Sequence, residues 1–243
     1  MTYVLVGAVG FLLGLVAHDV GVQSLDEDSR LRPLAGVCPR CRSIRGWLRV
    51  RCPQCGRLAN REPLVAATTA VVAIGMVETV GVSWELVPYL GFLGLTTALV
   101  ITDLEEFRIV DRLNVPGTLA LAVVLSVVAL STGASEALLR GLAGAAAYFA
   151  GSSLLFIIAG GRGFGAGDVK LSVQLGLFTA YLGWGVLGWA VFTTGLIGGA
   201  LALVMVVAGG AGRETELPYG PPMILGAWTA IVLVGVGAIP VPS

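Results

Sequence analysis

Histidine and lysine are nearly absent from this chain of 243 residues, since each occurs only once, as His18 and Lys170. A Ser-His-Asp triad would have to use His18, and the sequence contains neither a Gly-x-Ser-x-Gly motif nor a His-Glu-x-x-His motif. No Gly-Lys-Ser/Thr phosphate-binding loop surrounds Lys170. These absences argue against the corresponding classes of hydrolase and nucleotide-binding enzyme, and they leave carboxylates as the groups available for chemistry.

Charged residues are also scarce, at 12% of the chain, whereas 56% of the residues are hydrophobic and the mean hydropathy is +0.89. This composition leaves too little polar surface for a soluble globule of this length. The net charge is zero and the chain has no basic tail, so no nucleic-acid partner is expected. The composition predicts an all-α polytopic membrane protein whose surroundings are the lipid bilayer.

About 20 apolar residues cross the hydrocarbon core as a helix, and eight stretches of roughly that length predict about eight transmembrane helices. The apolar run from Leu171 to Gly210 is too long for one span, so two are expected, with a turn at Gly183-Trp184-Gly185. The expected spans are Tyr3–Val20, Leu64–Val82, Val87–Thr102, Val115–Leu130, Ala137–Gly160, Val169–Leu182, Val186–Ala208 and Pro221–Ile239.

The basic residues orient these spans. If the spans alternate in direction, every basic residue except Arg140 falls in loops on one side, and loops rich in arginine stay in the cytoplasm. We therefore expect a multi-pass protein of the cytoplasmic (inner) membrane with both termini outside. No basic residue precedes Arg30, so the first span lacks the charged start of a cleavable signal peptide and is expected to be retained. His18 and Asp19, near its inner end, are expected to form a polar pair at the interface.

All four cysteines lie between the first two spans, as Cys38, Cys41, Cys52 and Cys55. Two Cys-x-x-Cys knuckles separated by ten residues can place four thiolates around Zn²⁺. The alternatives are two disulfides or free thiols, and a cytoplasmic location favours reduced thiols. We predict a structural zinc site and three parts: a first transmembrane helix at 1–21, a cytoplasmic zinc-binding loop at 22–63 and a seven-helix membrane core at 64–243.

Asp103 and Asp168 lie at the ends of apolar runs on the same predicted side, and an ionisable residue at such a place indicates function. Asp168 closes a stretch with glycines at 163, 165 and 167, which allow the backbone to approach a bound chain closely. Two facing carboxylates can share one proton and activate a water molecule. Taken singly, each aspartate could instead be a helix cap or a solvated helix end. A helix N-terminus and Lys170 would favour the ionised form of Asp168.

Three motifs resemble those of the type IV prepilin peptidases, which are integral membrane aspartic proteases of the Gly-x-Gly-Asp group. The segment Asp103-Leu-Glu-Glu-Phe-Arg-Ile-Val-Asp111 is similar to the one that holds the family's first aspartate. The family's Gly-x-Gly-Asp-x-Lys motif is matched by Gly165, Gly167, Asp168 and Lys170, and Leu217-Pro218-Tyr219-Gly220-Pro221 is similar to its Pro-Phe-Gly-Pro turn. The resemblance runs from about Cys38 to Pro221 and departs from the family at Ala66 and Val110, where glutamate and proline are usual.

This resemblance implies that Asp103 and Asp168 are the catalytic pair and that Gly165, Gly167, Lys170 and Asp111 support them. The implied activity is removal of the basic leader from prepilins or pseudopilins at the cytoplasmic face of the membrane. Many family members also methylate the new N-terminus with S-adenosylmethionine, an activity for which the sequence shows no nucleotide-binding motif of its own.

Two alternatives come from other classes of protein. In a transporter, Asp103 and Asp168 would carry protons or cations near broken helices. In a non-enzymatic membrane anchor, the zinc loop would matter and the aspartates would not. The small residues Gly195, Gly198, Gly199 and Ala200 could support close helix packing, either inside the molecule or between copies in a homo-oligomer.

Overall fold

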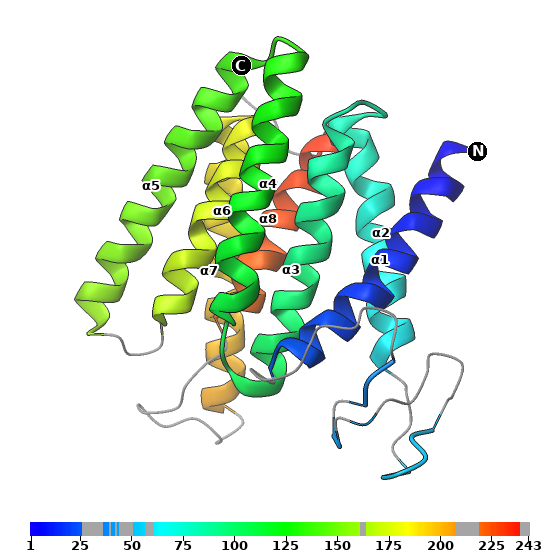
Figure 1. The fold of residues 1–243 in the computed structure, drawn as a ribbon. Helices are drawn as coiled ribbons and strands as arrows, with labels where there is room; N and C mark the ends of the chain where they lie inside the picture. Colours follow the sequence, from blue (N-terminus) through cyan, green and yellow to red (C-terminus); the bar gives the residue numbers. More distant parts are fainter. Residues whose placement is uncertain are drawn as a thin grey trace.

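The computed structural model describes residues 1–25, 36–38, 40–41, 43, 51–56, 61–160, 164–207 and 219–238. Every regular element within these ranges is an α-helix, which confirms the predicted all-α fold class. The helices of the described ranges are α1 (Thr2–Ser24), α2 (Arg61–Val80), α3 (Leu86–Glu106), α4 (Asp111–Ser131), α5 (Ser135–Ala159), α6 (Ala166–Leu182), α7 (Trp184–Val207) and α8 (Gly220–Gly235) (Figure 1).

Six of these helices, α1 to α5 and α7, are long and apolar enough to cross a membrane. The other two are shorter: α8 is an apolar helix of 16 residues, and α6 has 17 residues. At about 1.5 Å per residue, α6 is about 26 Å long, close to the ~30 Å of a hydrocarbon core. Helices satisfy their backbone hydrogen bonds internally, as a lipid environment requires. The chain is therefore a multi-pass membrane protein.

The helices run alternately up and down the bundle, so their ends form two groups (Figure 1). The ends of α1, α3, α5 and α7 and the starts of α2, α4, α6 and α8 lie at the lower end in this view. Asp103, near the end of α3, and Asp168, near the start of α6, therefore lie at the same end of the bundle. The described cysteine residues lie at this end as well.

α6 is buried along most of its length and packs most closely against α5. A Cβ atom added to Gly144 would lie 2.1 Å from the Cβ of Ala180, and one added to Gly176 would lie 2.5 Å from the carbonyl oxygen of Gly144. Only glycine allows the two backbones to approach this closely, as is common between membrane helices. This contact fixes the helix that carries Asp168 inside the bundle.

Aromatic side chains tie together the three helices that reach the candidate site, α3, α6 and α8. The rings of Phe92 and Phe178 stack with centroids 4.3 Å apart, and Trp228 lies 4.9 Å from Phe92. The Tyr89 hydroxyl donates a hydrogen bond of 2.6 Å to the carbonyl oxygen of Phe178. The Trp228 indole donates one of 3.0 Å to the Thr96 hydroxyl. The polar atoms of two buried aromatic residues are thus satisfied across helices, which specifies how the three helices pack.

The observed end of α3 differs from the predicted one. The helix continues through Glu106 rather than ending at Thr102, so Asp103 lies inside its last turns. Phe107 then adopts a left-handed conformation, with φ at 53°, and ends the helix. The apolar run stops at Thr102 because the following side chains are polar, but a helical backbone can continue at the membrane boundary while such side chains reach toward water.

The predicted turn between the sixth and seventh spans is shorter than expected. α6 ends at Leu182 and α7 begins at Trp184, so Gly183 alone separates the two helices. The predicted ends of the seventh and eighth spans, at Ala208 and Ile239, lie outside the described residues.

Candidate active site

Asp103 is a buried carboxylate, with 4% of its surface exposed. Its Oδ2 atom accepts no hydrogen bond from the described residues. The start of α8 lies directly against it, because a Cβ atom added to Gly220 would stand 2.9 Å from Oδ2. A buried polar oxygen without a partner is rare in proteins and often marks a place for water or a reacting group.

Asp168 is buried to a similar degree, at 7% exposed, and is the third residue of α6. Its Oδ2 atom accepts a hydrogen bond of 2.8 Å from the backbone N–H of Gly165, the residue before the helix. This is the reciprocal contact that an acidic third residue makes in a capping box. The helix N-terminus and this hydrogen bond favour negative charge, and they offset part of the cost of burying the carboxylate.

The two aspartates come together around Ile109, in the link between α3 and α4. A Cβ atom added to Gly167 would lie 3.0 Å from the Cβ of Ile109, and one added to Gly220 would lie 3.1 Å from its Cδ1. Ile109 thus contacts both the residue before Asp168 and the residue that faces Asp103. The two carboxylates are close enough to interact electrostatically. Three segments far apart in the sequence converge on one place.

Aromatic residues border this place. The Phe164 and Tyr219 rings meet edge to face with centroids 5.3 Å apart, so the segment before α6 contacts the segment before α8. Burial, followed by the negative charge of Asp168, raises the pKa of the Tyr219 hydroxyl. Tyr219 therefore stays a neutral hydrogen-bond donor beside Asp168 near neutral pH.

The predicted supporting residues lie around the pair of aspartates. Gly165 precedes α6 and binds Asp168, and Gly167 packs against Ile109, as described above. Lys170 and Asp111 form an ion pair that joins α6 to the start of α4. The sequence suggested that Lys170 would act on Asp168, whereas the structure pairs it with Asp111. Gly163, the first glycine of the motif, lies outside the described residues.

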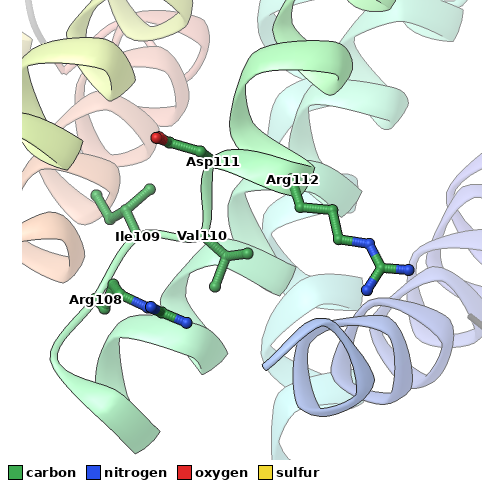
Figure 2. Close-up of a pocket in the computed structure, with 5 residues that line it drawn as sticks. All are labelled: Arg108, Ile109, Val110, Asp111 and Arg112. Atoms are coloured by element: carbon green, nitrogen blue, oxygen red, sulfur yellow. The ribbon is translucent and has the colours of Figure 1, made fainter. Parts of the chain in front are cut away.

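A cavity of about 380 Å³ lies along the link between α3 and α4 (Figure 2). It is lined by Arg108, Ile109, Val110, Asp111 and Arg112. Ile109 lines this cavity and also contacts Gly167 and Gly220, whereas neither Asp103 nor Asp168 is among the lining residues. A space of this size is comparable to the smaller ligand-binding pockets of proteins.

One polar pair near the site was missed by sequence reasoning. Gln174 of α6 donates a hydrogen bond of 2.9 Å to Asn114 of α4, and both side chains are buried. The pair lies one turn further along both helices than the contact between Lys170 and Asp111. The signal was present in the sequence, because polar side chains inside apolar spans usually face the bundle interior and pair with one another.

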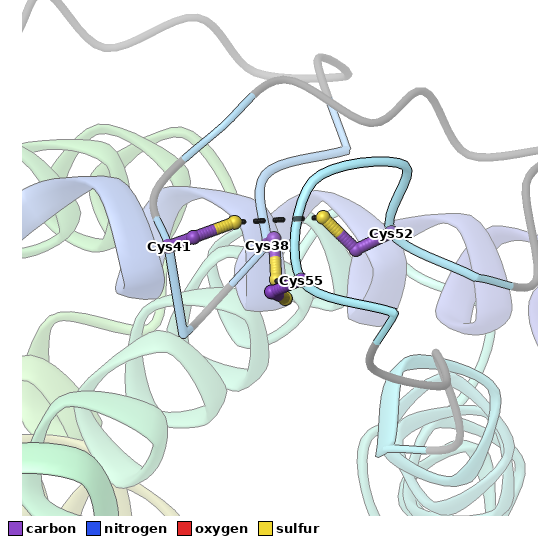
Figure 3. A group of neighbouring side chains, drawn as sticks. All are labelled: Cys38, Cys41, Cys52 and Cys55. Carbon is purple, nitrogen blue, oxygen red and sulfur yellow. Dashed lines mark hydrogen bonds between the residues drawn. The ribbon is translucent and has the colours of Figure 1, made fainter.

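The four cysteines form one cluster (Figure 3). Their sulfur atoms all lie within 4.8 Å of one another, with Cys38 and Cys55 sulfurs 3.6 Å apart and Cys41 and Cys52 sulfurs 3.4 Å apart. All four are free thiols, and a disulfide would require about 2.05 Å. Four sulfurs around Zn²⁺ at about 2.3 Å would stand about 3.8 Å apart. The donor set and its spacing therefore fit tetrahedral zinc.

The thiolate form that a metal requires is favoured at this cluster. The Ser43 hydroxyl lies 3.0 Å from the Cys41 sulfur and 3.4 Å from the Cys52 sulfur. This contact, aided by backbone N–H groups, lowers the pKa of Cys52 to about 5. A thiol that is ionised at neutral pH needs to release no proton when it binds a metal.

Comparison with known proteins connects this arrangement to one family. The family model described as the type IV leader peptidase family matches residues 90–210, a stretch that includes both aspartates. A prepilin leader peptidase/N-methyltransferase of Myxococcus xanthus is 30% identical over 235 residues, which cover 88% of this chain and 65% of that protein.

Two further relatives carry the same name. The protein of Aeromonas hydrophila is 26% identical over 76% of this chain and 63% of its own length. The protein of Pseudomonas aeruginosa is 26% identical over 81% of this chain and 70% of its own length. The chain thus spans roughly two thirds of these relatives. No solved structure matches it significantly. The match to the family model, together with similarity to these relatives over most of the chain, shows that the chain belongs to the type IV leader peptidase family.

Proposed function

We propose that this chain is an aspartic endopeptidase of the inner membrane. It removes the basic leader from type IV prepilins or pseudopilins at the cytoplasmic face, with Asp103 and Asp168 as its catalytic residues. The observation that carries the proposal is the convergence of two buried carboxylates, from α3 and α6, at the start of α8. The names of the relatives, all prepilin leader peptidases, support the substrate class.

The two aspartates have different surroundings, which suggests which one is the general base and which one is the general acid. Asp168 accepts a backbone N–H and lies at a helix N-terminus, so it is suited to be the ionised base. Asp103 is not at a helix N-terminus, and although the Gly220 N–H acts on its carboxylate, Oδ2 accepts no well-formed hydrogen bond from the described residues, so Asp103 is suited to carry the shared proton as the acid. Like charges at close range disfavour ionisation of both carboxylates at once, so one proton is held by the pair.

Hydrolysis follows from this arrangement. Asp168 takes a proton from a water molecule while the water oxygen bonds to the scissile carbonyl carbon, and Asp103 gives its proton to the carbonyl oxygen. The tetrahedral diol then collapses. Its C–N bond breaks as Asp168 returns the proton to the nitrogen, and Asp103 recovers its own from a hydroxyl group. The products are the leader carboxyl group and the new N-terminal amine.

The other features of the site take supporting roles in this proposal. The cysteine cluster binds a structural zinc ion, because four protein thiolates leave no open position for a substrate. The ion pair between Lys170 and Asp111 holds α4 and α6 in register beside the catalytic carboxylates. The names of the relatives include N-methyltransferase, so transfer of a methyl group from S-adenosylmethionine to the new N-terminus is a second activity to test on the same product.

The proposal is tested by co-expressing a prepilin that has a Gly-Phe leader junction with the intact protein, Asp103→Asn or Asp168→Asn. We expect the intact protein to shorten the prepilin and both variants to leave it uncut, because an amide can act neither as the base nor as the shared acid. Glu136→Gln is the matched control, since Glu136 is an exposed carboxylate at the opposite end of the bundle. Mass spectrometry of the product would also show whether one methyl group is added.

Insertion of each variant in the membrane must be confirmed by immunoblot. Cleavage that persists in both variants would contradict the assignment of the catalytic pair. No cleavage by the intact protein would contradict the substrate class.

A further inference from the structure

A buried carboxylate outside the candidate active site holds the segment that leads into the cysteine cluster. Asp19 lies near the end of α1 with only 1% of its surface exposed. Its Oδ2 atom accepts a hydrogen bond of 2.7 Å from the Gly36 N–H, and its Oδ1 atom accepts one of 2.8 Å from the Val37 N–H. Hydrogen bonds to a charged acceptor are strong, and a buried carboxylate needs them.

These two N–H groups are directly connected to the cysteine cluster. Val37 precedes Cys38, whose backbone N–H donates a hydrogen bond of 3.0 Å to the carbonyl oxygen of Ser43. The Ser43 hydroxyl in turn contacts the sulfurs of Cys41 and Cys52. The geometry of the cluster therefore determines where the N–H groups that face Asp19 can stand.

The same segment reaches the helix that carries Asp103. Val37, Val22 of α1 and Ile101 of α3 form one buried apolar cluster. α1 and α3 lie close together here, because a Cβ atom added to Gly21 would stand 2.8 Å from the carbonyl oxygen of Ala98. Ile101 is two residues before Asp103. The segment at 36–38 thus packs against α1 and α3 at the end of the bundle that holds the candidate active site.

We propose that Asp19 is a positioning residue that couples metal binding at the four cysteines to docking of the segment 36–38 against α1 and α3. A metal ion draws Cys38 into the cluster and so holds the Gly36 and Val37 N–H groups over Asp19. Thermodynamic linkage makes the two effects equal. Docking on Asp19 must raise the metal affinity by the same factor by which metal binding raises the equilibrium constant for docking. Without the metal the segment can leave, and Asp19 loses two bonds that a buried carboxylate requires.

The metal readout of this proposal is independent of the proposed peptidase activity. In the purified full-length protein loaded with zinc, Asp19→Asn should transfer zinc to a chromogenic chelator more readily than the intact protein. We expect roughly a tenfold to hundredfold loss of zinc affinity, as is typical when a partner outside the ligand set is removed. An amide can accept only one of the two N–H groups without presenting a donor to the other. Glu136→Gln again serves as the control.

A second measurement needs no variant. Hydrogen exchange of the intact protein should show the amides of Gly36 and Val37 protected with zinc and at least tenfold less protected after chelation. If Asp19→Asn fails to fold, this measurement still tests whether docking of the segment 36–38 depends on metal binding. Equal zinc affinity in the intact protein and a folded Asp19→Asn, or equal protection with and without zinc, would overturn the proposal.

The consequence for activity rests on the proposed function. If the intact protein cleaves prepilin, chelation should lower cleavage by the intact protein and have a smaller effect on Asp19→Asn, whose docking is already weakened. If neither the intact protein nor any variant cleaves prepilin, the proposed function is rejected. The zinc-affinity and hydrogen-exchange results would still test the role of Asp19.

Discussion

At the scale of single residues, the candidate site depends on a glycine that faces a carboxylate. Gly220 lies within the motif that resembles the family's Pro-Phe-Gly-Pro turn, and the structure supplies a physical reason for that glycine. A Cβ atom at this position would lie 2.9 Å from Oδ2 of Asp103 and 3.1 Å from Cδ1 of Ile109, so a side chain fits only if these atoms shift. A larger residue would have to displace the carboxylate, the isoleucine or the start of α8.

We therefore predict that Gly220→Ala lowers prepilin cleavage by roughly 10- to 100-fold, because small displacements of a catalytic group cost about this much. The matched control is Gly199→Ala in α7, where an added Cβ atom would meet no atom within 4 Å. Cleavage by both variants is compared with that of the intact protein in membranes that hold equal amounts of each. Equal activity of Gly220→Ala and the control would show that the close contact does not position Asp103.

At the scale of elements, a side chain forms hydrogen bonds with the backbone at each end of α6. At its start, Gly165 and Asp168 form the capping contact. At its end, the Arg140 side chain donates hydrogen bonds of 2.9 Å and 2.6 Å to the carbonyl oxygens of Ala180 and Tyr181. The last carbonyls of a helix have no partner within it, and a cation there also interacts well with the helix dipole. The one basic residue that the orientation rule left on the outer side thus has a structural role.

We expect Arg140→Gln to destabilise the protein by about 1–3 kcal/mol, the range for a lost hydrogen bond to a charged donor. Arg140→Lys should lose less, because it keeps the charge without the fork geometry of the guanidinium. Thermal unfolding of the purified variants in detergent, followed by circular dichroism, measures the effect as a lower Tm. A Tm for Arg140→Gln equal to that of the intact protein would rule out this capping role.

At the scale of the whole molecule, the helices alternate in direction (Figure 1), which places the candidate catalytic residues and the cysteine cluster at one end of the bundle. Asp103, Asp168 and the four cysteines lie there, and Ser135, at the start of α5, lies at the other end. The basic residues of the loops predict that this end of the bundle faces the cytoplasm. A substrate with a basic leader in the cytoplasm would then meet the aspartates at the membrane boundary.

This orientation predicts from which side of the membrane a reagent can label the cysteine thiols. After treatment with a metal chelator, a membrane-impermeant maleimide should label the native cysteines in inverted membrane vesicles but not in intact spheroplasts. A Ser135→Cys variant adds the matched control, because its new thiol should be labelled in spheroplasts. Labelling of the native cysteines from outside would reverse the proposed topology and place the aspartates on the wrong side for a cytoplasmic leader.

The sequence alone determined the all-α class, the approximate helix positions and the placement of both aspartates at one end. Long apolar runs must form helices in lipid, and the parity of the spans assigns each loop to a side. Family motifs then singled out Asp103 and Asp168, whose catalytic roles stay predictions.

Only the tertiary structure decided which groups meet: Gly220 with Asp103, Lys170 with Asp111, Asn114 with Gln174, and Asp19 with the backbone before Cys38. Lipid is as apolar as a protein core, so hydropathy cannot tell the face of a helix that packs from the face that meets lipid. Contacts between residues far apart in the sequence depend on that packing, which is why the pattern of apolar runs could not reveal them.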